Sequence, residues 1–503
     1  MAKAIMIQGT TSNAGKSLLA AGLCRVLRQD GLRVAPFKSQ NMALNSYITA
    51  DGLEMGRAQV TQAECAGIAP DVRMNPILLK PNSDTGSQVI VNGEVLGNMP
   101  AAEYFAYKKR LIPDILRAYK SLAAENDVIV LEGAGSPAEI NLKDEDIVNM
   151  GMARMAGAPV LLVGDINPGG VFAALTGTVQ LLEPDERALL KGVVINKFRG
   201  DPHILAPGLK KLEQIIQKPV LGVVPYLQLD VDDEDSLSDR LTVQGQIPCP
   251  VDIAVIRLPR LSNFTDFAPL DLVEGVRVRY VGTPSQLGAP DLIILPGTKN
   301  TMGDMVWLRQ SGLESRIMVH AEAGKPVFGI CGGYQMLGTL LHDPMGLEYG
   351  GSMPGFGLLE METTFFPRKQ RAQVWGKIGC IDGFFSGLSG ASVTGYEIHM
   401  GDSRCEAPPF CTLSGREGER FDGTAQGNIC GTYVHGVFDE PEVARGIAGA
   451  LLKAKGMDFS QVQAVDPFVY KQQQYDILAE NLRMTLDMKK IYDIIEKGGV
   501  ADE

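Results

Sequence analysis

The chain has 503 residues, enough for two or three domains with large cores, and its 45% hydrophobic and 21% charged residues are typical of a globular enzyme. The formal net charge of −12 disfavours nucleic acid or an anionic membrane surface as a partner. Eight cysteines without a CxxC pair indicate neither a disulfide framework nor a zinc site. Because there is no signal-peptide pattern and no apolar run of the ~20 residues that a membrane span needs, we expect a cytoplasmic protein.

The first motif is a phosphate-binding loop. Residues 5–17 read IMIQGTTSNAGKS, an apolar strand followed by a glycine-bounded loop, and residues 18–27 are apolar and helix-competent. A polyphosphate requires inward-pointing backbone N–H groups, an ammonium and a hydroxyl for Mg²⁺. The residues that can supply these are Gly9, Thr10, Gly15, Lys16 and Ser17. ATP with Mg²⁺ is the implied ligand; the alternative, a glycine-rich turn that binds nothing, is disfavoured by the Lys-Ser pair directly after the second glycine.

The loop departs from the common spacing, because five residues separate Gly9 from Gly15 instead of four. With Thr10 in second place, it resembles the loop of dethiobiotin synthetase-like ATPases, which phosphorylate a carboxylate.

A polar stretch, SQNMALNSYITADGLEMGRAQ, follows a second predicted strand at residues 32–37. Ligands of open α/β sheets bind beyond the C-terminal ends of the strands, so this stretch is expected to face the substrate. Its candidate substrate-binding residues are Lys38, Gln40, Asn41 and Arg57. Asp51, Glu54 and Arg57 fall at helical spacing, which predicts either metal-facing carboxylates beside a guanidinium or a surface ion pair.

Further strands are predicted at residues 127–131, 160–165, 192–196 and 219–226, each followed by a helical or loop stretch. Glu132 ends the first of these strands and can bind Mg²⁺ alongside Ser17; the alternative is that it caps the following loop. The alternation predicts a mostly parallel, doubly wound α/β domain over residues 1–229.

Four strings in this half resemble cobyric acid synthases, the glutamine-dependent amidotransferases of corrinoid assembly. They are FKSQNMALNS (37–46), DGLEMGRAQ (51–59), MNPILLKP (74–81) and EGAGSPAEINL (132–142). The resemblance implies a magnesium role for Glu132 and an adenine-side position for Asn196 in NKFRGD. Asn167 and Pro168 depart from the family's DIDRGG pattern, which leaves open which basic residue acts there.

The acidic, then Gln- and Pro-rich residues 230–250 are predicted to be a linker. Strand patterns resume at residue 251, and the strand at 325–330 leads into CGGYQMLG. A cysteine between a strand and a helix, followed by two glycines, indicates a nucleophile elbow at Cys331; a buried structural cysteine is the alternative. GICGGYQMLG resembles the signature of class I glutamine amidotransferases, which implies a flavodoxin-like domain over residues 251–445.

The thiol requires a base, and the chain has five histidines. By resemblance His435, in GTYVHGVF, takes this role, and His399, in GYEIHMG, is a motif residue without it. Many class I amidotransferases carry a glutamate where this chain has Val437, so the resemblance implies a Cys-His dyad.

Glu397 and Glu440 are the candidates for orienting the imidazole. By resemblance to this fold, backbone N–H groups of Gly297 and Gly332 are the expected oxyanion donors. Residues 446–503 are predicted to form a helical extension, with an amphipathic helix over residues 475–495 that packs on a domain or on a second subunit of a homo-oligomer.

By resemblance the reaction is the ATP- and glutamine-dependent amidation of the b, d, e and g carboxylates of adenosylcobyrinic acid a,c-diamide, through acyl phosphates, in cobalamin biosynthesis. Two alternatives remain: cobyrinic acid a,c-diamide synthase, and a regulatory P-loop ATPase with an inactive amidotransferase-like domain. Regulatory ATPases of that class usually begin the loop with a lysine, and this loop has none before Lys16.

Overall fold

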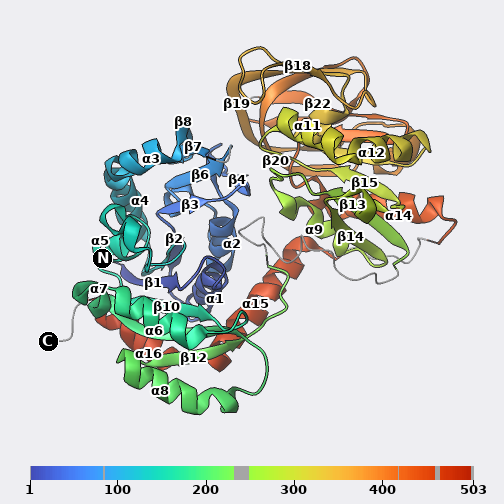
Figure 1. Cartoon of the computed structure of the whole chain (residues 1–503). Coiled ribbons are helices and arrows are strands. Elements are labelled where there is room, and N and C mark those ends of the chain that lie inside the picture. The colour runs from blue at the N-terminus through green and yellow to red at the C-terminus, as the bar shows by residue number, and fades with distance from the viewer. Residues whose placement is uncertain (1, 83–84, 232–248, 417, 459–464, 500–503) are drawn as a thin grey trace. The chain divides into compact units, whose positions relative to one another are not determined.

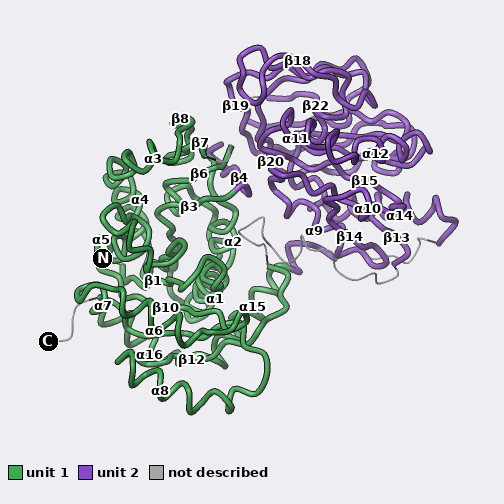
Figure 2. The backbone as a smooth tube through the Cα atoms, in the orientation of Figure 1, with its two compact units in different colours: residues 1–43, 54–234, 471–503 green, residues 44–53, 235–470 purple. Residues whose placement is uncertain are grey.

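The computed structural model describes residues 2–82, 85–231, 249–416, 418–458 and 465–499 (Figure 1). The chain divides into two compact units (Figure 2). Unit 1 comprises Met1–Ala43, Glu54–Glu234 and Lys471–Glu503, and unit 2 comprises Leu44–Leu53 and Asp235–Tyr470. The units are therefore not consecutive stretches of sequence, as the predicted domains were. Most of the predicted linker, residues 232–248, lies outside the described residues.

Unit 1 contains the predicted doubly wound sheet. All strand pairs are parallel. The strand order is β12 (Val220–Pro225), β11 (Leu190–Phe198), β10 (Val160–Asp165), β1 (Lys3–Gly9), β9 (Val128–Glu132) and β2 (Val34–Phe37). Because the strands run in one direction, their C-terminal ends meet at one edge, where Gly9, Glu132 and Asn196 are found.

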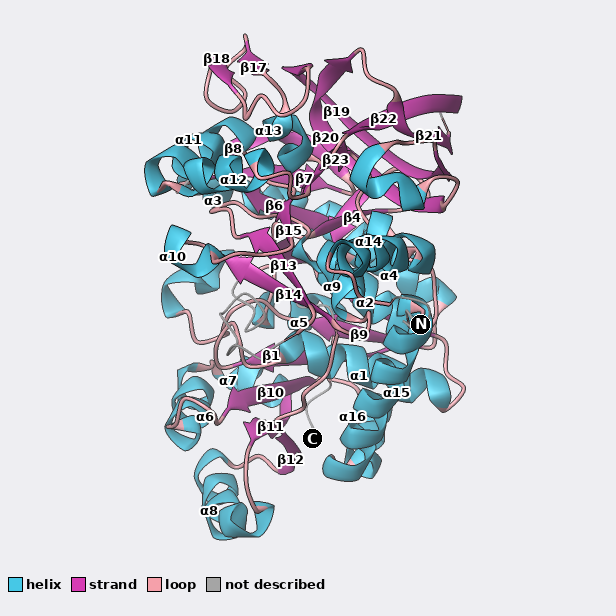
Figure 3. Cartoon of the chain, turned by 90° about the vertical axis from the view of Figure 1, so that its right-hand side faces the viewer, coloured by secondary structure: helices cyan, strands magenta, loops and turns pink. Residues whose placement is uncertain are grey.

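Helices cover both faces of this sheet (Figure 3). The helices of unit 1 are α1 (Lys16–Gln29), α2 (Arg57–Ala66), α3 (Ala101–Tyr107), α4 (Ile112–Glu125), α5 (Met150–Ala156), α6 (Val171–Leu181), α7 (Pro184–Leu189), α8 (Ala206–Ile216), α15 (Pro467–Thr485) and α16 (Met488–Lys497). The alternate strand residues Ile5 and Ile7 share one core with α1, α15 and α16. α6 packs against β10 and α7 against β11.

The predicted single helix over residues 475–495 is in fact two helices. α15 ends at Thr485, and the N–H of Asp487 donates to the carbonyl of Leu221 at 2.7 Å before α16 begins. From Lys471 on, this extension belongs to unit 1, where Tyr475, Leu478 and Leu482 are buried in the core. Its apolar face thus covers a domain of the same chain.

A smaller sheet of unit 1 consists of β3 (Gln40–Met42), β6 (Ile77–Pro81), β7 (Gly86–Val91) and β8 (Glu94–Pro100). Residues 51–57 do not form the helix that the spacing of their charges implies. Residues 49–53 are a turn with Gly52 at φ +78°, β5 (Glu54–Gly56) follows, and α2 begins only at Arg57. Glu54 is buried and pairs with Lys80 at 2.9 Å instead of facing a metal.

Unit 2 has, within its described residues, one 11-stranded mixed sheet. Its parallel part is β14 (Val276–Val281), β13 (Val251–Ile256), β15 (Leu292–Leu295), β16 (Val327–Ile330) and β23 (Ile429–Thr432). It continues through β22 (Gly418–Gln426), β21 (Pro409–Gly415), β19 (Met361–Ile378), β17 (Leu340–Asp343) and β18 (Gly351–Pro354), and β20 (Ser392–Cys405) pairs with β19.

The helices of unit 2 are α9 (Ala268–Asp271), α10 (Pro284–Leu287), α11 (Thr301–Ser311), α12 (Leu313–Glu322), α13 (Gly332–Leu337) and α14 (Pro441–Ala454). A short strand from the first half of the sequence, β4 (Ser46–Ile48), also belongs to this unit. In the part of the chain that the structure describes, no helix has both the length and the apolar character of a membrane span.

Two candidate active sites

The predicted phosphate loop connects β1 to α1. Gly15, the residue before the helix, has φ +92°, and a Cβ there would lie 2.1 Å from Nδ2 of Asn196. Only glycine fits this position without strain. The Asn196 amide in turn donates to the carbonyl of Ala14 at 2.9 Å. Asn196 therefore braces the loop from the neighbouring part of the sheet edge.

Lys16 Nζ is held over the loop by backbone carbonyls. It donates to the oxygens of Thr11, Ser12 and Gly135 at 2.8, 2.9 and 3.1 Å. The ammonium is thus positioned by the loop itself and by the segment after β9. A phosphate group in the loop would meet a lysine that is already oriented.

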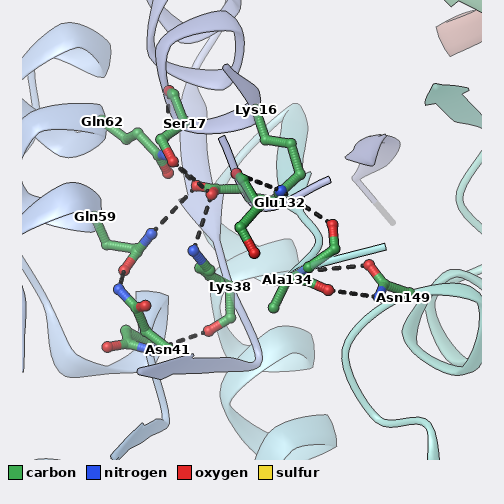
Figure 4. A network of polar contacts seen from close by, with 12 residues as sticks. Lys16, Ser17, Lys38, Asn41, Gln59, Gln62, Glu132, Ala134 and Asn149 are labelled. Atoms are coloured by element: carbon green, nitrogen blue, oxygen red, sulfur yellow. Dashed lines mark hydrogen bonds and ion pairs between the residues drawn. The ribbon is translucent and has the colours of Figure 1, made fainter. Parts of the chain in front are cut away.

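Glu132 is the centre of a buried polar network (Figure 4). Its side chain is 0% exposed, and its Oε1 accepts from the Ser17 hydroxyl at 2.7 Å and from Lys38 Nζ at 2.9 Å. Its Oε2 accepts from Gln62 at 2.6 Å. A carboxylate so fully removed from water requires such partners, because an unpaired buried charge costs several kcal/mol. Glu132 is therefore built into the site and does not simply cap a loop.

The predicted substrate-binding residues lie on the same side of unit 1. Asn41 donates to Gln59 at 3.0 Å, and Gln59 reaches Oε2 of Glu132 at 3.4 Å, so Asn41 joins the network through one intermediate. Gln40 accepts from the hydroxyl of Tyr104. Arg57 is the first residue of α2 and is 9% exposed.

A magnesium ion fits the oxygens of Ser17 and Glu132, since a hard cation prefers hydroxyl and carboxylate ligands and these two groups are already 2.7 Å apart. Asp51 does not join them. It belongs to unit 2, its carboxylate accepts from Arg416 at 2.9 Å, and its side chain is 77% exposed. We therefore leave Asp51 out of the ligand set. Among the described residues, no cluster of three His, Cys, Asp or Glu side chains could hold a metal by itself.

Cys331 occupies the predicted elbow between β16 and α13. Its φ of +52° and ψ of −110° are strained for a residue with a side chain. The two following glycines are required by close approach, because a Cβ on Gly332 would lie 2.8 Å from Thr298 Cγ2 and one on Gly333 would lie 2.0 Å from the Leu295 carbonyl. This geometry holds the thiol at the C-terminal end of the parallel strands.

His435 lies beside the elbow and is the candidate for its base. Its Nδ1 lies 2.6 Å from Oδ2 of Asp266, and the Cys331 thiol donates to the carbonyl of Ile398 at 3.5 Å. Burial alone would lower the pKa of His435, but the charge and hydrogen bond of Asp266, together with Cys331, outweigh it and raise the pKa to about 10. The imidazole thus has one nitrogen fixed by a carboxylate and the other available to the thiol.

Asp266 is the residue that the sequence analysis missed. It lies in the 3₁₀ turn Phe264–Phe267, shortly after β13, and both candidates proposed for its role are wrong. Glu397 is paired with Arg420, and Glu440 is the residue before α14. The string SNFTDF was visible as a motif after the first strand of the second half, but nothing local indicated that its aspartate reaches a histidine 169 positions away.

His399 differs from His435 in both partner and charge. Burial lowers the pKa of His399 to about 3, and its Nδ1 faces the carbonyl of Gly401 at 3.1 Å. Its ring stacks on Tyr433 with centroids 3.7 Å apart. It is a neutral packing residue at working pH, which supports the assignment of the base to His435.

The expected oxyanion glycines border the same site. A Cβ on Gly297 would lie 2.9 Å from Cε1 of His435, so this backbone passes directly beside the imidazole. Gly332 follows the nucleophile and begins α13.

Comparisons with known proteins agree with the two predicted kinds of domain. Residues 5–236 match the CobQ/CobB/MinD/ParA nucleotide binding domain, and residues 252–443 match the CobB/CobQ-like glutamine amidotransferase domain. A cobyric acid synthase of Ruminiclostridium cellulolyticum is 59% identical over 99% of this chain and 98% of the relative. Those of Lachnoclostridium phytofermentans and Streptococcus sanguinis are 56% and 51% identical, each over 99% of this chain and over 100% and 99% of the relative. The chain belongs to the cobyric acid synthase family.

This chain has Pro168 where the DIDRGG pattern of the cobyric acid synthase family has an arginine, so another basic residue was expected near the phosphate loop. Lys197, directly after Asn196, pairs with Asp165 at 2.9 Å and donates to the carbonyl of Asn13 in the phosphate loop at 2.7 Å. A basic side chain therefore does contact the loop. It comes from β11 instead of from the segment after β10.

Proposed function

We propose that this chain amidates the b, d, e and g carboxylates of adenosylcobyrinic acid a,c-diamide to give adenosylcobyric acid. The observation that carries the proposal is that one chain holds both a phosphate loop beside the buried Glu132 and a Cys331–His435 pair. Relatives that match this chain over nearly their full length are named cobyric acid synthase. The corrinoid and glutamine are its substrates, and ATP and Mg²⁺ are required.

In unit 1 the residues are arranged for carboxylate activation. Lys16 and the backbone of the loop would bind the polyphosphate, while Ser17 and Glu132 would hold Mg²⁺, which neutralises phosphate charge when bound. A substrate carboxylate oxygen attacks the γ-phosphorus and ADP leaves, giving an acyl phosphate. Ammonia then attacks the carbonyl carbon and phosphate leaves. Lys38, Gln40, Asn41 and Arg57 are the proposed contacts to the acidic substrate.

In unit 2 the residues are arranged for release of ammonia from glutamine. The Cys331 sulfur attacks the carboxamide carbon while N–H groups of Gly297 and Gly332 stabilise the oxyanion. His435 takes the proton of the Cys331 thiol as the sulfur attacks and gives it to the leaving ammonia; it then takes a proton from the water that hydrolyses the thioester and returns it to the departing sulfur. A histidine whose pKa is raised to about 10 is a suitable proton donor at neutral pH.

Asp266 extends the expected dyad to a triad. Its carboxylate accepts from His435 Nδ1, which fixes the tautomer and stabilises the imidazolium formed during the reaction. The same geometry argues against an inactive amidotransferase-like domain, because an unused site has no need to keep a strained nucleophile, its base and the base's carboxylate together.

The test is a reaction of the purified protein with ATP, Mg²⁺, glutamine and adenosylcobyrinic acid a,c-diamide, followed by mass spectrometry of the corrinoid. Four successive replacements of OH by NH₂ are expected. A parallel reaction with cobyrinic acid distinguishes the sibling a,c-diamide synthase, whose product would carry two. Glutaminase activity without any change in the corrinoid would overturn the substrate assignment.

We also propose that ammonia does not mix with bulk solvent on its way to the acyl phosphate. With saturating glutamine and added ¹⁵N-ammonium, the product should contain almost only glutamine nitrogen. Equal use of both nitrogen sources would contradict this.

A further inference from the structure

Ten residues from the first half of the sequence, Leu44–Leu53, belong to unit 2 (Figure 2). Ile48 is fully buried and forms an apolar cluster with Tyr396 and Ile398 of β20. Gln373 of β19 donates to the carbonyl of Ile48. The segment is therefore part of the fold of unit 2.

The segment contacts Tyr396, the first support of the catalytic histidine. The Tyr396 hydroxyl donates to the carbonyl of Ser46 at 3.0 Å, and the Tyr47 ring meets the Tyr396 ring edge-on with centroids 5.2 Å apart. On its other side, Tyr396 stacks on the His435 ring with centroids 5.4 Å apart and an interplanar angle of 20°. The backbones of Tyr396 and His435 exchange hydrogen bonds of 3.1 and 2.8 Å.

The segment also contacts the turn that carries Asp266, the second support. The N–H of Ser46 donates to Oδ1 of Asn263 at 3.0 Å, and the N–H of Phe264 donates to Oδ1 of Asn45 at 3.3 Å. The Asp266 N–H in turn donates to the carbonyl of Asn263 at 3.1 Å. Asn263 has φ +52°, a conformation that requires such external fixation.

We propose that residues 44–53 are a positioning element of the glutamine-hydrolysing centre, with Asn45, Ser46 and Tyr47 holding both supports of His435 in place. The inference rests on the proposed role of His435 as the base. It does not depend on which carboxylate the synthetase unit amidates.

The chain on either side of the segment returns to unit 1 and to the network around Glu132. Asn41 lies three residues before the segment and contacts Gln59, and Glu54 directly after it pairs with Lys80. The covalent ends of the positioning element are thus held by the synthetase unit.

The test uses full-length Tyr47→Ala and Asn45→Ala variants, with glutaminase measured without corrinoid. We expect kcat for glutamine to fall roughly 10- to 100-fold and KM to change less than about twofold, because a misplaced base affects the chemical step more than binding. Tyr47→Phe keeps the ring contact and should restore most of kcat. The matched control is Arg416→Gln, which removes the ion pair at the outer end of the same segment and touches neither support; its kcat should equal that of the parent.

MgATP-induced thermal stabilisation reports whether unit 1 is intact, and it should be unchanged in all four variants. Unaltered kcat in Tyr47→Ala, an equal loss in Arg416→Gln, or a loss of the MgATP response together with kcat would each overturn the proposal. Failure of the proposed triad itself would look different, since the Cys331→Ala variant would then retain glutaminase activity.

Discussion

The two units place their chemistry at the same kind of turn, a parallel strand that leads through a left-handed residue into a helix, but they use different residues there. In unit 1 that residue is Gly15, at φ +92°. In unit 2 it is Cys331, at φ +52°. Glycine adopts such a conformation without strain, whereas for a residue with a side chain it costs of order 1–3 kcal/mol.

The difference follows from which atoms act on the substrate. The phosphate loop works through backbone N–H groups and through Lys16, one residue further on, so its turn position can lack a side chain. At the proposed glutamine site the turn residue is itself the proposed nucleophile, and glycine has no thiol. The strain at Cys331 is therefore a consequence of placing the reactive atom at the turn.

The largest expected effect separates the two sites completely. Lys16→Ala should abolish amidation with either glutamine or ammonium as nitrogen source, by roughly 10³-fold or more, because the charge on the transferred phosphoryl group is no longer offset. Cys331→Ala should abolish glutamine-dependent amidation by roughly 10³- to 10⁶-fold and leave ammonium-dependent amidation intact. Steady-state assays with both nitrogen sources measure this. If Lys16→Ala kept amidation with either nitrogen source, or if Cys331→Ala also lost ammonium-dependent amidation, the assignment of the two reactions to separate sites would be wrong.

Replacing Asp266 should have the next largest effect. Asp266→Asn keeps the shape but removes the charge that fixes the His435 tautomer, so glutaminase kcat should fall by roughly 10²- to 10⁴-fold. Glu397→Gln is the matched control, because Glu397 pairs with Arg420 and does not reach the imidazole. Comparable losses in both variants would indicate general damage to the sheet.

The Asp266–His435 pair predicts a dependence of stability on pH. The pKa of His435 is raised to about 10 in the folded protein, above the ordinary histidine value of 6.5, so the folded state binds this proton more tightly. The pair's stabilisation is complete below pH 6.5 and is lost as the pH rises toward 10. The melting temperatures of the parent and of Asp266→Asn should thus differ most near pH 6 and converge near pH 10; a constant gap would contradict the raised pKa.

A smaller effect tests the strain directly. Cys331→Gly should melt at a higher temperature than Cys331→Ala, by the equivalent of about 1 kcal/mol, although alanine is ordinarily the more stable choice. At position 15 the order should be the same, with Gly15→Ala melting below the parent, since alanine there is strained and its Cβ would lie 2.1 Å from the Asn196 amide. Calorimetric melting of the three variants checks both orders, and equal midpoints for the two Cys331 variants would show that the turn stores no strain.

The smallest effect concerns how α1 and α13, the helices that follow the two turns, are covered. Every residue of α13 is buried, whereas α1 is covered on one side by α15, where Arg25 pairs with Asp476 at 2.8 Å. Asp476→Asn should lower the free energy of unfolding by less than about 1 kcal/mol, because this carboxylate is half exposed. The hydrogen bond from Arg25 lowers the pKa of Asp476, so the contribution exists above the unfolded pKa of about 3.8 and is lost as the pH falls below it.

Asp114→Asn, in an exposed pair with Arg117, is the control and should change the melting temperature less. If Asp476→Asn lowered the free energy of unfolding by as much as the strain at Cys331, then α15 would help to set the geometry of the phosphate loop as well as covering α1.

The sequence predicted those parts of the sites that depend on neighbouring residues. The phosphate loop, Glu132 at a strand end and Cys331 between a strand and two glycines are each local patterns with a local physical reason. Asp266 and the segment around Tyr47 could not be found this way, because their roles depend on contacts across 169 and 349 positions, and one sequence holds no record of such pairs. The helix wrongly expected around Asp51 could have been excluded from the sequence, because the Asp-Gly dipeptide there is typical of a turn.

The placement of residues 44–53 has an evolutionary consequence. Exchange of whole amidotransferase halves between related genes, joined anywhere after residue 231, would leave this segment with its old sequence against a foreign Asn263, Tyr396 and Arg416. Such hybrids would inherit a mismatch beside the catalytic histidine even though each half was intact. The two halves of this enzyme are therefore expected to be inherited together, and substitutions near position 46 to be accompanied by substitutions some 350 positions downstream.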